Sequence, residues 1–276
     1  MNAEIMINRK QNAKVLVSVI IPTWNRGKFL KEAVESVLKQ TEHSIEVLVC
    51  DDGSDDNSSD LIKDIGDGRV HWLPGVRTGL PGPTRNRGIR NASGEWVAFL
   101  DSDDTWFPHK LEFQLRIAKT FNVLAVSSNA KRFSPITGYS DGPLIDYSKD
   151  RITLNDLLSI NWVICSSMLV HSSVIPILEG FPEDTKFRAI EDYAFWMRVA
   201  TLTDIAYIAD PLLCYRDDPG ASIRAIETLE ESELRKRVFG NYLYWCLRSN
   251  NKKCLRLFSK ITLFWLKNIV QQKLLI

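Results

Sequence analysis

The sequence predicts an α/β fold with a mostly parallel central sheet and flanking helices. Apolar, β-branched runs of strand length, such as residues 15–22, alternate with segments whose apolar residues recur at helical spacing, such as 28–41. Such runs are typical of strands buried on both faces, and their alternation with helices implies right-handed crossovers between parallel strands. The chain of 276 residues, 45% hydrophobic and 25% charged, is long enough for one large domain with an appendage.

The first part of the chain contains four alternations of a strand with a helix. Strands are expected at 15–22, from 45, at 70–73 and from 95, and helices at 28–41, at 61–65, from about 83 to 94 and from about 108. The second strand breaks into an acidic, Gly-containing loop, and a Gly/Pro-rich loop precedes the third helix. Each strand is therefore followed by polar residues at its carboxyl end.

Beyond about residue 120 the pattern is mixed. Strands are expected at 123–129 and 166–175, and a helix at 189–201. The irregular segment 134–150 contains Gly and Pro, and such a segment can form a lid over a site. The stretch 157–178 lacks charges and is long enough to span a bilayer, but it contains several Ser, an Asn, a His and Pro176. We therefore expect a buried strand with its flanks there.

The charge and the cysteines exclude several classes of protein. The net charge is +1, which implies no polyelectrolyte partner such as nucleic acid. The five cysteines form no C-x-x-C pair, so we expect reduced thiols and a cytoplasmic location, without a disulfide framework or zinc site. Residues 1–14 form an N-terminal extension without an apolar core, which does not fit a secretory signal.

The stretch "AFLDSDDTWFPHKL" (98–111) places three carboxylates, Asp101, Asp103 and Asp104, at the end of an apolar strand. One interpretation is a polar turn that closes a buried strand, and the other is a cation site. Two aspartates one residue apart can bind one hard divalent cation, Mg²⁺ or Mn²⁺, with phosphate oxygens completing the coordination shell. The chain has no Walker phosphate loop and no G-x-G-x-x-G fingerprint.

Polar residues follow two other predicted strands in the same way, at Pro22–Asn25 and Asp51–Asp52. In a parallel sheet the carboxyl ends of the strands lie along one edge, and ligands bind at that edge. Three polar strand ends on one edge favour a ligand site over three unrelated turns.

Four segments occur in a fixed order and carry a resemblance: "VSVIIPTWNRGKFLKEAVESVLKQT", "EVLVCDDGSDDNS", "GPTRNRGIRNASGEWVAFLDSDDTW" and "GFPEDTKFRAIEDYAFWMR". Together, over about residues 15–215, they resemble the family-two glycosyltransferases, which have the Rossmann-like GT-A fold. The resemblance implies an inverting enzyme that moves a sugar from a nucleotide-diphosphate sugar, often a UDP-sugar, to a glycan or lipid-linked acceptor in cell-surface polysaccharide synthesis. It also implies Mn²⁺ or Mg²⁺ at the D-x-D motif formed by Asp101 and Asp103.

The resemblance further implies a division of the chain. Residues 15–220 would form the GT-A catalytic domain, with a nucleotide-binding half at 15–105 and an acceptor-binding half at 106–220. Residues 221–276 would form a basic, amphipathic helical tail, since no acidic residue follows Glu233. The apolar stripe of this tail comprises Leu257, Ile261, Phe264 or Trp265, and Leu266. Two alternatives stay open: peripheral contact with an anionic membrane on its cytoplasmic face, or packing on the catalytic domain.

By the same resemblance, a set of residues binds the donor: Pro22, Thr23, Trp24, Asn25, Asp52, Arg85, Asp101 and Ser102. Pro22 and Thr23 would contact the nucleoside through the backbone. Trp24 would stack on the base, or alternatively pack in the core. Asp52 would accept a hydrogen bond from the base, and for Asp51 beside it a role that is limited to capping the next turn is an equal alternative.

The resemblance assigns the chemistry to four carboxylates. Asp103 would be the direct metal ligand, and Asp101 would face the ribose and a metal-bound water. Asp192 would be the base that takes the proton of the acceptor hydroxyl, with Glu191 as the alternative or as the residue that orients it. For this acidic pair a structural role at a helix N-terminus is the competing explanation, and Asp104 could cap the helix that follows it.

Two other function classes compete with this assignment. A sugar-nucleotide nucleotidyltransferase shares the general architecture, but its early Gly-rich signature is missing from "IIPTWNRGKF". A non-catalytic nucleotide-sugar-binding module is disfavoured because Asp101, Asp103 and Asp192 are all present. The sequence does not identify the sugar, the acceptor or the linkage.

Overall fold

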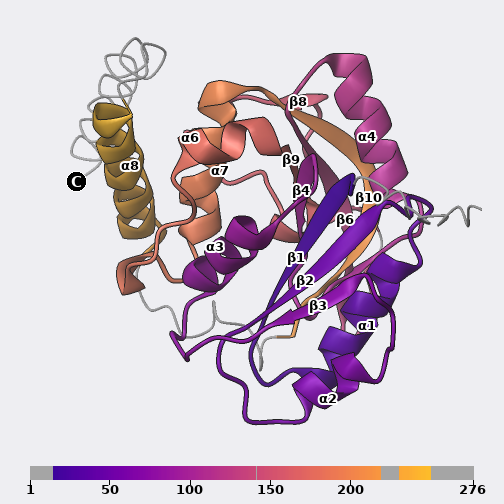
Figure 1. The fold of residues 1–276 in the computed structure, drawn as a ribbon. Coiled ribbons are helices and arrows are strands. Elements are labelled where there is room, and N and C mark those ends of the chain that lie inside the picture. Colours follow the sequence, from indigo (N-terminus) through magenta and orange to yellow (C-terminus); the bar gives the residue numbers. More distant parts are fainter. Residues whose placement is uncertain (1–14, 141, 219–229, 250–276) are drawn as a thin grey trace, which may run out of the picture.

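A twisted sheet lies between two layers of helices in the structure, which is a computed structural model that describes residues 15–140, 142–218 and 230–249. Helices α1, α2 and α4 cover one face of the sheet, and α3 and α7 cover the other (Figure 1). Helix α8 lies outside α7. This three-layer α/β arrangement confirms the fold class expected from the alternation of strands and helices.

The described part of the chain contains ten strands in one sheet, eight α-helices and three short 3-10 turns. The strands are β1 (Val17–Thr23), β2 (Ile45–Asp51), β3 (Val70–Leu73), β4 (Trp96–Phe99), β5 (Thr105–Trp106), β6 (Ala125–Ser134), β7 (Gly138–Tyr139), β8 (Arg151–Ile152), β9 (Leu169–His171) and β10 (Ile205–Arg216). The α-helices are α1 (Gly27–Leu38), α2 (Ser58–Lys63), α3 (Pro81–Asn91), α4 (Lys110–Phe121), α5 (Leu154–Leu157), α6 (Ile175–Leu178), α7 (Glu191–Leu202) and α8 (Glu231–Arg248). The 3-10 turns are η1 (Cys165–Ser167), η2 (Ser172–Val174) and η3 (Thr185–Phe187).

The sheet has the strand order β3-β2-β1-β4-β9-β6-β10-β5. Strands β3, β2, β1 and β4 are parallel, as expected, and β10 is parallel to β6. Strand β9 is antiparallel to both of its neighbours and joins the two parallel groups. It is shorter than the strand expected at 166–175, because 3-10 turns occupy the residues on either side of Leu169–His171.

The sheet is buried on both faces, which explains the largely apolar sequence of its strands. Val17, Val19 and Ile21 of β1 pack with α1 in one core, and Ile20 packs with α5 and α7 in the other. All four side chains are fully buried. Burying a Val or Ile side chain contributes about 1.5–3 kcal/mol, so these strands anchor the loops at their ends.

Helix α3 lies directly against the sheet, and one glycine permits this contact. A Cβ atom at Gly88 would lie 2.5 Å from Cγ2 of Ile20 on β1 and 2.9 Å from Sγ of Cys50 on β2. The helix begins with Pro81, whose fixed φ suits the first helical turn. Arg85 lies between Pro81 and Gly88, and the helix therefore places it at the carboxyl edge of the sheet.

Helix α8, the described part of the expected C-terminal tail, packs on the second core. Trp245 and Tyr242 are buried, and the Tyr242 hydroxyl hydrogen-bonds to Oγ1 of Thr201 on α7 at 2.7 Å. For residues 231–248 the structure therefore shows packing on the domain. The apolar stripe from Leu257 to Leu266 and the extension 1–14 lie outside the described residues. None of the described helices is long and apolar enough to cross a bilayer.

Candidate active site

The carboxyl ends of β1, β2 and β4 meet at one edge of the sheet. The register pairs Pro22 of β1 with Cys50 of β2, and Ile20 of β1 with Phe99 of β4. The loops that begin at Trp24, Asp52 and Asp101 therefore leave the sheet side by side. The structure thus brings together the three strand ends that the sequence placed on one edge.

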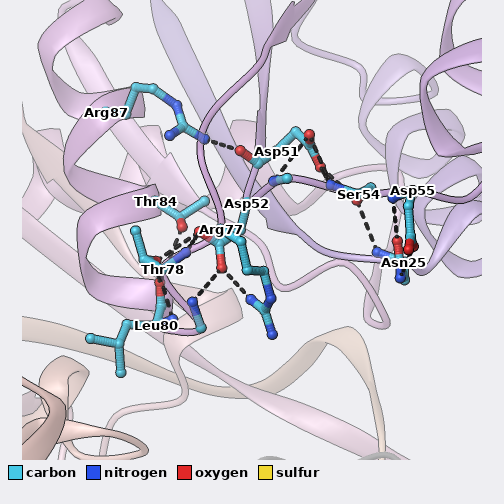
Figure 2. A network of polar contacts seen from close by, with 12 residues as sticks. Asn25, Asp51, Asp52, Ser54, Asp55, Arg77, Thr78, Leu80, Thr84 and Arg87 are labelled. Carbon is cyan, nitrogen blue, oxygen red and sulfur yellow. Dashed lines mark hydrogen bonds and ion pairs between the residues drawn. The ribbon is translucent and has the colours of Figure 1, made fainter.

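Asp52 is the centre of a polar network after β2 (Figure 2). Its Oδ1 accepts hydrogen bonds from the Thr78 amide at 2.9 Å and the Thr78 hydroxyl at 2.7 Å. Its Oδ2 accepts one from the Gly79 amide at 2.8 Å and forms an ion pair with Arg77. Burial alone would raise the pKa of Asp52, but these hydrogen bonds outweigh it and hold the pKa below its usual value.

Trp24 lies at the surface beside this network. Its side chain is 44% exposed, which excludes the alternative of a core aromatic. The Arg77 guanidinium lies over the Trp24 ring, 3.7 Å from its centroid. A planar cation therefore contacts both the indole face of Trp24 and the carboxylate of Asp52.

Asn25 and Asp51 hold the two loops together. The backbone amide of Asn25 donates to Oγ of Ser54 at 2.9 Å, and the side-chain Oδ1 of Asn25 accepts from the backbone amide of Asp55 at 3.0 Å. The Asp51 carboxylate accepts from the Ser54 amide at 3.0 Å, so it caps the turn after β2 (Figure 2). Asn25 has a φ of 50°, a left-handed conformation that asparagine tolerates better than most residues.

Arg85 links the two motifs that the sequence assigned to the donor and to the acceptor side. Its Nη2 donates to Oδ1 of Asp101 at 2.7 Å, and its Nη1 donates to Oε1 of Glu191 at 2.7 Å. The Arg85 side chain is almost fully buried. Burial by itself would lower the pKa of Arg85, but Cys165, Asp101 and Glu191 raise it well above its usual value. Arg85 is therefore a permanent cation that joins α3 to the first residue of α7.

Asp192 follows Glu191 in the first turn of α7 and is 7% exposed. Asp192 lies within electrostatic range of the Cys165 thiol of η1. The charges of Arg85, Asp101 and Glu191 also act on that thiol. Burial raises the pKa of Cys165 first, Arg85 opposes this, and the three carboxylates raise it further. Asp101 and Asp192 thus belong to one cluster of charges, 91 positions apart in the sequence.

Asp103 forms an ion pair with Arg26, which follows the polar end of β1. Burial raises the pKa of Asp103, the positive charge of Arg26 opposes this, and the negative charge of Asp101 adds to it. Arg85 engages Oδ1 of Asp101 and Arg26 engages Oδ2 of Asp103, so each carboxylate keeps one oxygen outside these pairs. Both side chains are partly exposed.

These two carboxylates fit a divalent cation that also binds phosphate. They are hard oxygen ligands, and a cation between them would relieve their mutual repulsion. No group of three or more His, Cys, Asp or Glu suited to a metal occurs in residues 15–140, 142–218 and 230–249. A donor set of two carboxylates is what a Mg²⁺ or Mn²⁺ site needs if substrate oxygens supply the remaining ligands.

Asp104 does not cap the helix that follows it, which corrects the expectation that it could. Helix α4 begins only at Lys110, and Asp104 is 1% exposed. It accepts hydrogen bonds from Oγ of Ser166 at 2.5 Å and from the Arg216 amide at 2.8 Å. Asp104 thus ties the acidic turn to η1 and to the end of β10.

The remaining residues of the expected donor set line the same edge. Pro22 is half-buried on β1, and the carbonyl of Thr23 accepts from the Asp52 amide at 2.9 Å. Thr23 Oγ1 is buried without a hydrogen-bond partner in the described part of the chain. Ser102 is buried between Asp101 and Asp103.

Sequence reasoning missed four residues of this site: Arg26, Arg77, Ser166 and Arg216. Arg26, Arg77 and Arg216 all lie at or after the carboxyl ends of strands. The rule that ligands bind at the carboxyl ends of parallel strands would have identified them, had it been applied to every strand. Ser166 had no such signal, because its contacts join residues more than 60 positions apart in the sequence. Its hydroxyl donates to Asp104 and accepts from the Asp101 amide at 3.0 Å. Arg87 is half-buried and donates to the carbonyl of Asp51 (Figure 2).

Comparison with known proteins gives a consistent result. The profile of the family described as "Glycosyl transferase family 2" matches residues 18–173. An Escherichia coli protein, "UDP-Glc:alpha-D-GlcNAc-diphosphoundecaprenol beta-1,3-glucosyltransferase WfgD", is 28% identical over 230 residues, which cover 83% of this chain and 87% of the relative.

Two solved structures share the fold. The first is S. aureus TarS 1–349 in complex with UDP-GlcNAc, with a TM-score of 0.69 and 20% identity over 86% of this chain and 68% of that chain. The second is the mannosyltransferase PcManGT from Pyrobaculum calidifontis in complex with GDP-Man and Mn²⁺, with a TM-score of 0.57 and 18% identity over 86% of this chain and 72% of that chain. At this level of identity the matches show the fold.

Proposed function

Because the chain belongs to glycosyltransferase family 2, we propose that it moves a sugar, with inversion, from a UDP-sugar to a hydroxyl group of a lipid-linked saccharide. The single observation that carries this proposal is the cluster around Arg85. It brings a D-x-D turn at the donor edge and an acidic pair at the start of α7 to one place. A displacement needs both: a site for the leaving diphosphate and a base for the attacking hydroxyl.

The nucleotide would bind at the edge formed by Trp24 and Asp52. Trp24 presents an exposed indole face, and the buried Asp52 carboxylate would accept a hydrogen bond from a base N–H in place of the one it now accepts from Arg77. The Arg77 guanidinium now contacts both groups, so a uracil ring would take its place or stack beside it. A base–aromatic stack contributes about 1–3 kcal/mol, enough to make Trp24 a main determinant of donor affinity.

Asp101 and Asp103 would hold a Mn²⁺ or Mg²⁺ ion together with the diphosphate. When bound, the cation supplies a Lewis acid that stabilises the negative charge of the leaving group. In the absence of the cation, the positive charge of Arg26 compensates the negative charge of Asp103. Arg85 fixes the orientation of the Asp101 carboxylate, because its two Nη groups donate to Asp101 and to Glu191 at the same time.

Asp192 would act as the base. As the acceptor oxygen forms its bond to the anomeric carbon, the bond from that carbon to the diphosphate oxygen breaks, and its electron pair leaves with the diphosphate. The Asp192 carboxylate receives the proton of the acceptor hydroxyl on the opposite face of the sugar, which gives inversion. Glu191 would act as a positioning residue, because its ion pair with Arg85 fixes the start of α7.

The acceptor assignment rests on the relative from Escherichia coli, whose name specifies a diphosphoundecaprenol-linked N-acetylglucosamine. A lipid-linked acceptor would require the enzyme to work at a membrane surface, and peripheral contact on the cytoplasmic face is part of the proposal. The basic residues between Lys252 and Lys273 would provide this contact, and they lie outside the described residues.

The proposal is tested by incubating the purified protein with UDP-glucose, Mn²⁺ and N-acetylglucosamine diphosphate carrying a short alkyl chain. We expect a disaccharide product and UDP, and loss of both with EDTA. Release of pyrophosphate from UTP and glucose 1-phosphate would instead indicate a nucleotidyltransferase. Binding of UDP-sugars without turnover, across a panel of sugars and acceptors, would indicate a non-catalytic module.

A further inference from the structure

A cavity of about 350 Å³ opens beside α5, outside the groups assigned above. Cavities of about 300–1,000 Å³ are the usual size of small-molecule sites. Its walls come from the segment before α5, from α5 itself and from the segment after it, and they include Asp146, Tyr147, Asn155, Asp156, Ser159 and Trp162. The first two residues belong to the irregular segment in which the sequence predicted a lid.

The register of the sheet places this cavity at the level of the reaction centre. A row of paired residues crosses β4, β9, β6 and β10, formed by Ala98, Leu169, Val126 and Ala206. Tyr207 is therefore level with Phe99, which lies two residues before Asp101. The Tyr207 ring meets the ring of Tyr147 edge-on, with 5.2 Å between centroids. The wall formed by Tyr147 is thus level with the carboxyl end of β4, with β9 and β6 between them.

One hydrogen bond and one short segment of chain connect the cavity to the proposed base. The hydroxyl of Tyr193, the residue after Asp192, donates to the carbonyl of Leu157 at the end of α5. Trp162 lies three residues before Cys165, the thiol on which the charge of Asp192 acts. Tyr193, Leu157 and Tyr207 also share one core, so α5, α7 and the cavity wall lie on the same face of the sheet.

The chemistry of the walls suits a sugar ring. The rings of Tyr147 and Trp162 lie 5.0 Å apart at 44°, and they offer an aromatic surface to the C–H face of a pyranose. The Tyr147 hydroxyl donates to the carbonyl of Arg151 at 2.7 Å, which fixes that ring. Around the rings, Asn155 and Ser159 are exposed and can exchange hydrogen bonds with sugar hydroxyl groups.

The charge of the walls argues against a phosphate in this cavity. Asp146 and Asp156 contribute two carboxylates against the single ammonium group of Lys149, which is already paired with Asp156 at 2.5 Å. A phosphate would meet net negative charge there, whereas a neutral sugar would find acceptors for its hydroxyl protons.

We propose that this cavity binds a pyranose ring of the acceptor saccharide, an inference that rests on the glycosyltransferase function proposed above. Tyr147 and Trp162 stack on the ring, and Asp146, Asn155 and Ser159 select its hydroxyl groups. The hydroxyl that reacts then points along α5 towards Asp192, and the lipid diphosphate of the acceptor lies outside the cavity.

The test fills the cavity without removing a core contact. In Ser159→Trp an indole replaces an exposed hydroxymethyl group, and Lys119→Trp on α4 is the matched control on the opposite face. Transfer from UDP-glucose to the alkyl N-acetylglucosamine diphosphate and hydrolysis of UDP-glucose by water are measured in parallel. We expect Ser159→Trp to raise the acceptor KM at least about tenfold, with the donor KM for hydrolysis within about twofold, because only acceptor binding is lost.

A second pair of variants tests the stacking directly. Trp162→Phe should keep the acceptor KM close to that of the wild type, and Trp162→Ala should raise it, at melting temperatures that confirm folding. An unchanged acceptor KM in Ser159→Trp would overturn the inference, and so would a loss of donor hydrolysis equal to the loss of transfer in a folded variant. A wild type that neither hydrolyses nor transfers from any UDP-sugar would contradict the proposed function instead.

Discussion

Arg85 and Glu191, 106 positions apart in the sequence, form an ion pair of 2.7 Å that joins helix α3 to the start of helix α7. The same guanidinium holds Asp101, so the orientation of the D-x-D turn and that of the acidic pair are coupled through one side chain. A lysine ammonium could pair with both carboxylates, but it lacks the rigid planar fork with which the guanidinium fixes their orientation.

We predict that Arg85→Ala lowers the free energy of unfolding by about 3–5 kcal/mol, because it leaves the buried Glu191 carboxylate without its counter-charge. Arg85→Lys should recover part of the stability but little of the turnover. Urea denaturation and transfer rates of both variants provide the measurement, with Arg90→Ala on the exposed side of α3 as the control. A stability of Arg85→Ala within about 1 kcal/mol of the wild type would contradict the role of the pair.

Trp24 is predicted to stack on the nucleobase. Trp24→Ala should weaken UDP binding about 5–150-fold, since stacking a base on an aromatic ring contributes about 1–3 kcal/mol. Trp24→Phe keeps an aromatic face and should bind UDP nearly as well as the wild type. Isothermal titration calorimetry with UDP measures both, and equal affinities for the alanine variant and the wild type would show that the base binds elsewhere.

The acid stability of the protein should depend on Asp52. Its pKa in the folded protein lies below the value of about 3.9 in an unfolded chain, so the ionised form stabilises the fold above that pH. This contribution is lost as the pH falls through the folded pKa. The difference in the free energy of unfolding between wild type and Asp52→Asn should therefore shrink between about pH 5 and pH 3. Urea denaturation at several pH values measures it, and a difference that grows on acidification would have the wrong sign.

Asp103 should be required for metal binding. In the presence of UDP, Asp103→Asn should weaken Mn²⁺ binding at least about tenfold, because one of two protein carboxylates is lost. Free Mn²⁺ is measured by electron paramagnetic resonance, independently of turnover. Asp60→Asn, an exposed carboxylate on α2, is the matched control. If Asp103→Asn and Asp60→Asn bound Mn²⁺ alike, the ion would be held by other groups.

The sequence predicted the sheet well because strand burial leaves a direct signal. Residues 15–22 are apolar except for Ser18, since both faces of β1 are covered. That the polar residues after β1, β2 and β4 lie on one edge of the sheet followed from the parallel topology alone. The acidic turn was also recognised, because Asp101 and Asp103 sit where that rule puts ligand-binding groups.

The partners of these residues were harder to predict, because they depend on contacts between distant segments. Nothing local to "TRNRG" indicates that Arg85 reaches Glu191, and nothing local to Arg26 indicates its pair with Asp103. The length of β9 was overestimated because 3-10 turns interrupt an apolar run that reads as a strand. Asp104 was assigned an uncertain role because its partners, Ser166 and Arg216, come from two elements far along the chain.

Asp192→Asn is the most informative variant, because we propose that Asp192 takes the proton of the acceptor hydroxyl at a centre shared with the D-x-D turn. The control is Asp184→Asn, an exposed carboxylate that caps η3 just before α7. We predict that Asp192→Asn lowers kcat by about 10²–10⁴, the usual contribution of a general base, while UDP-sugar affinity stays at the wild-type value. Turnover of Asp192→Asn equal to that of Asp184→Asn would contradict the account.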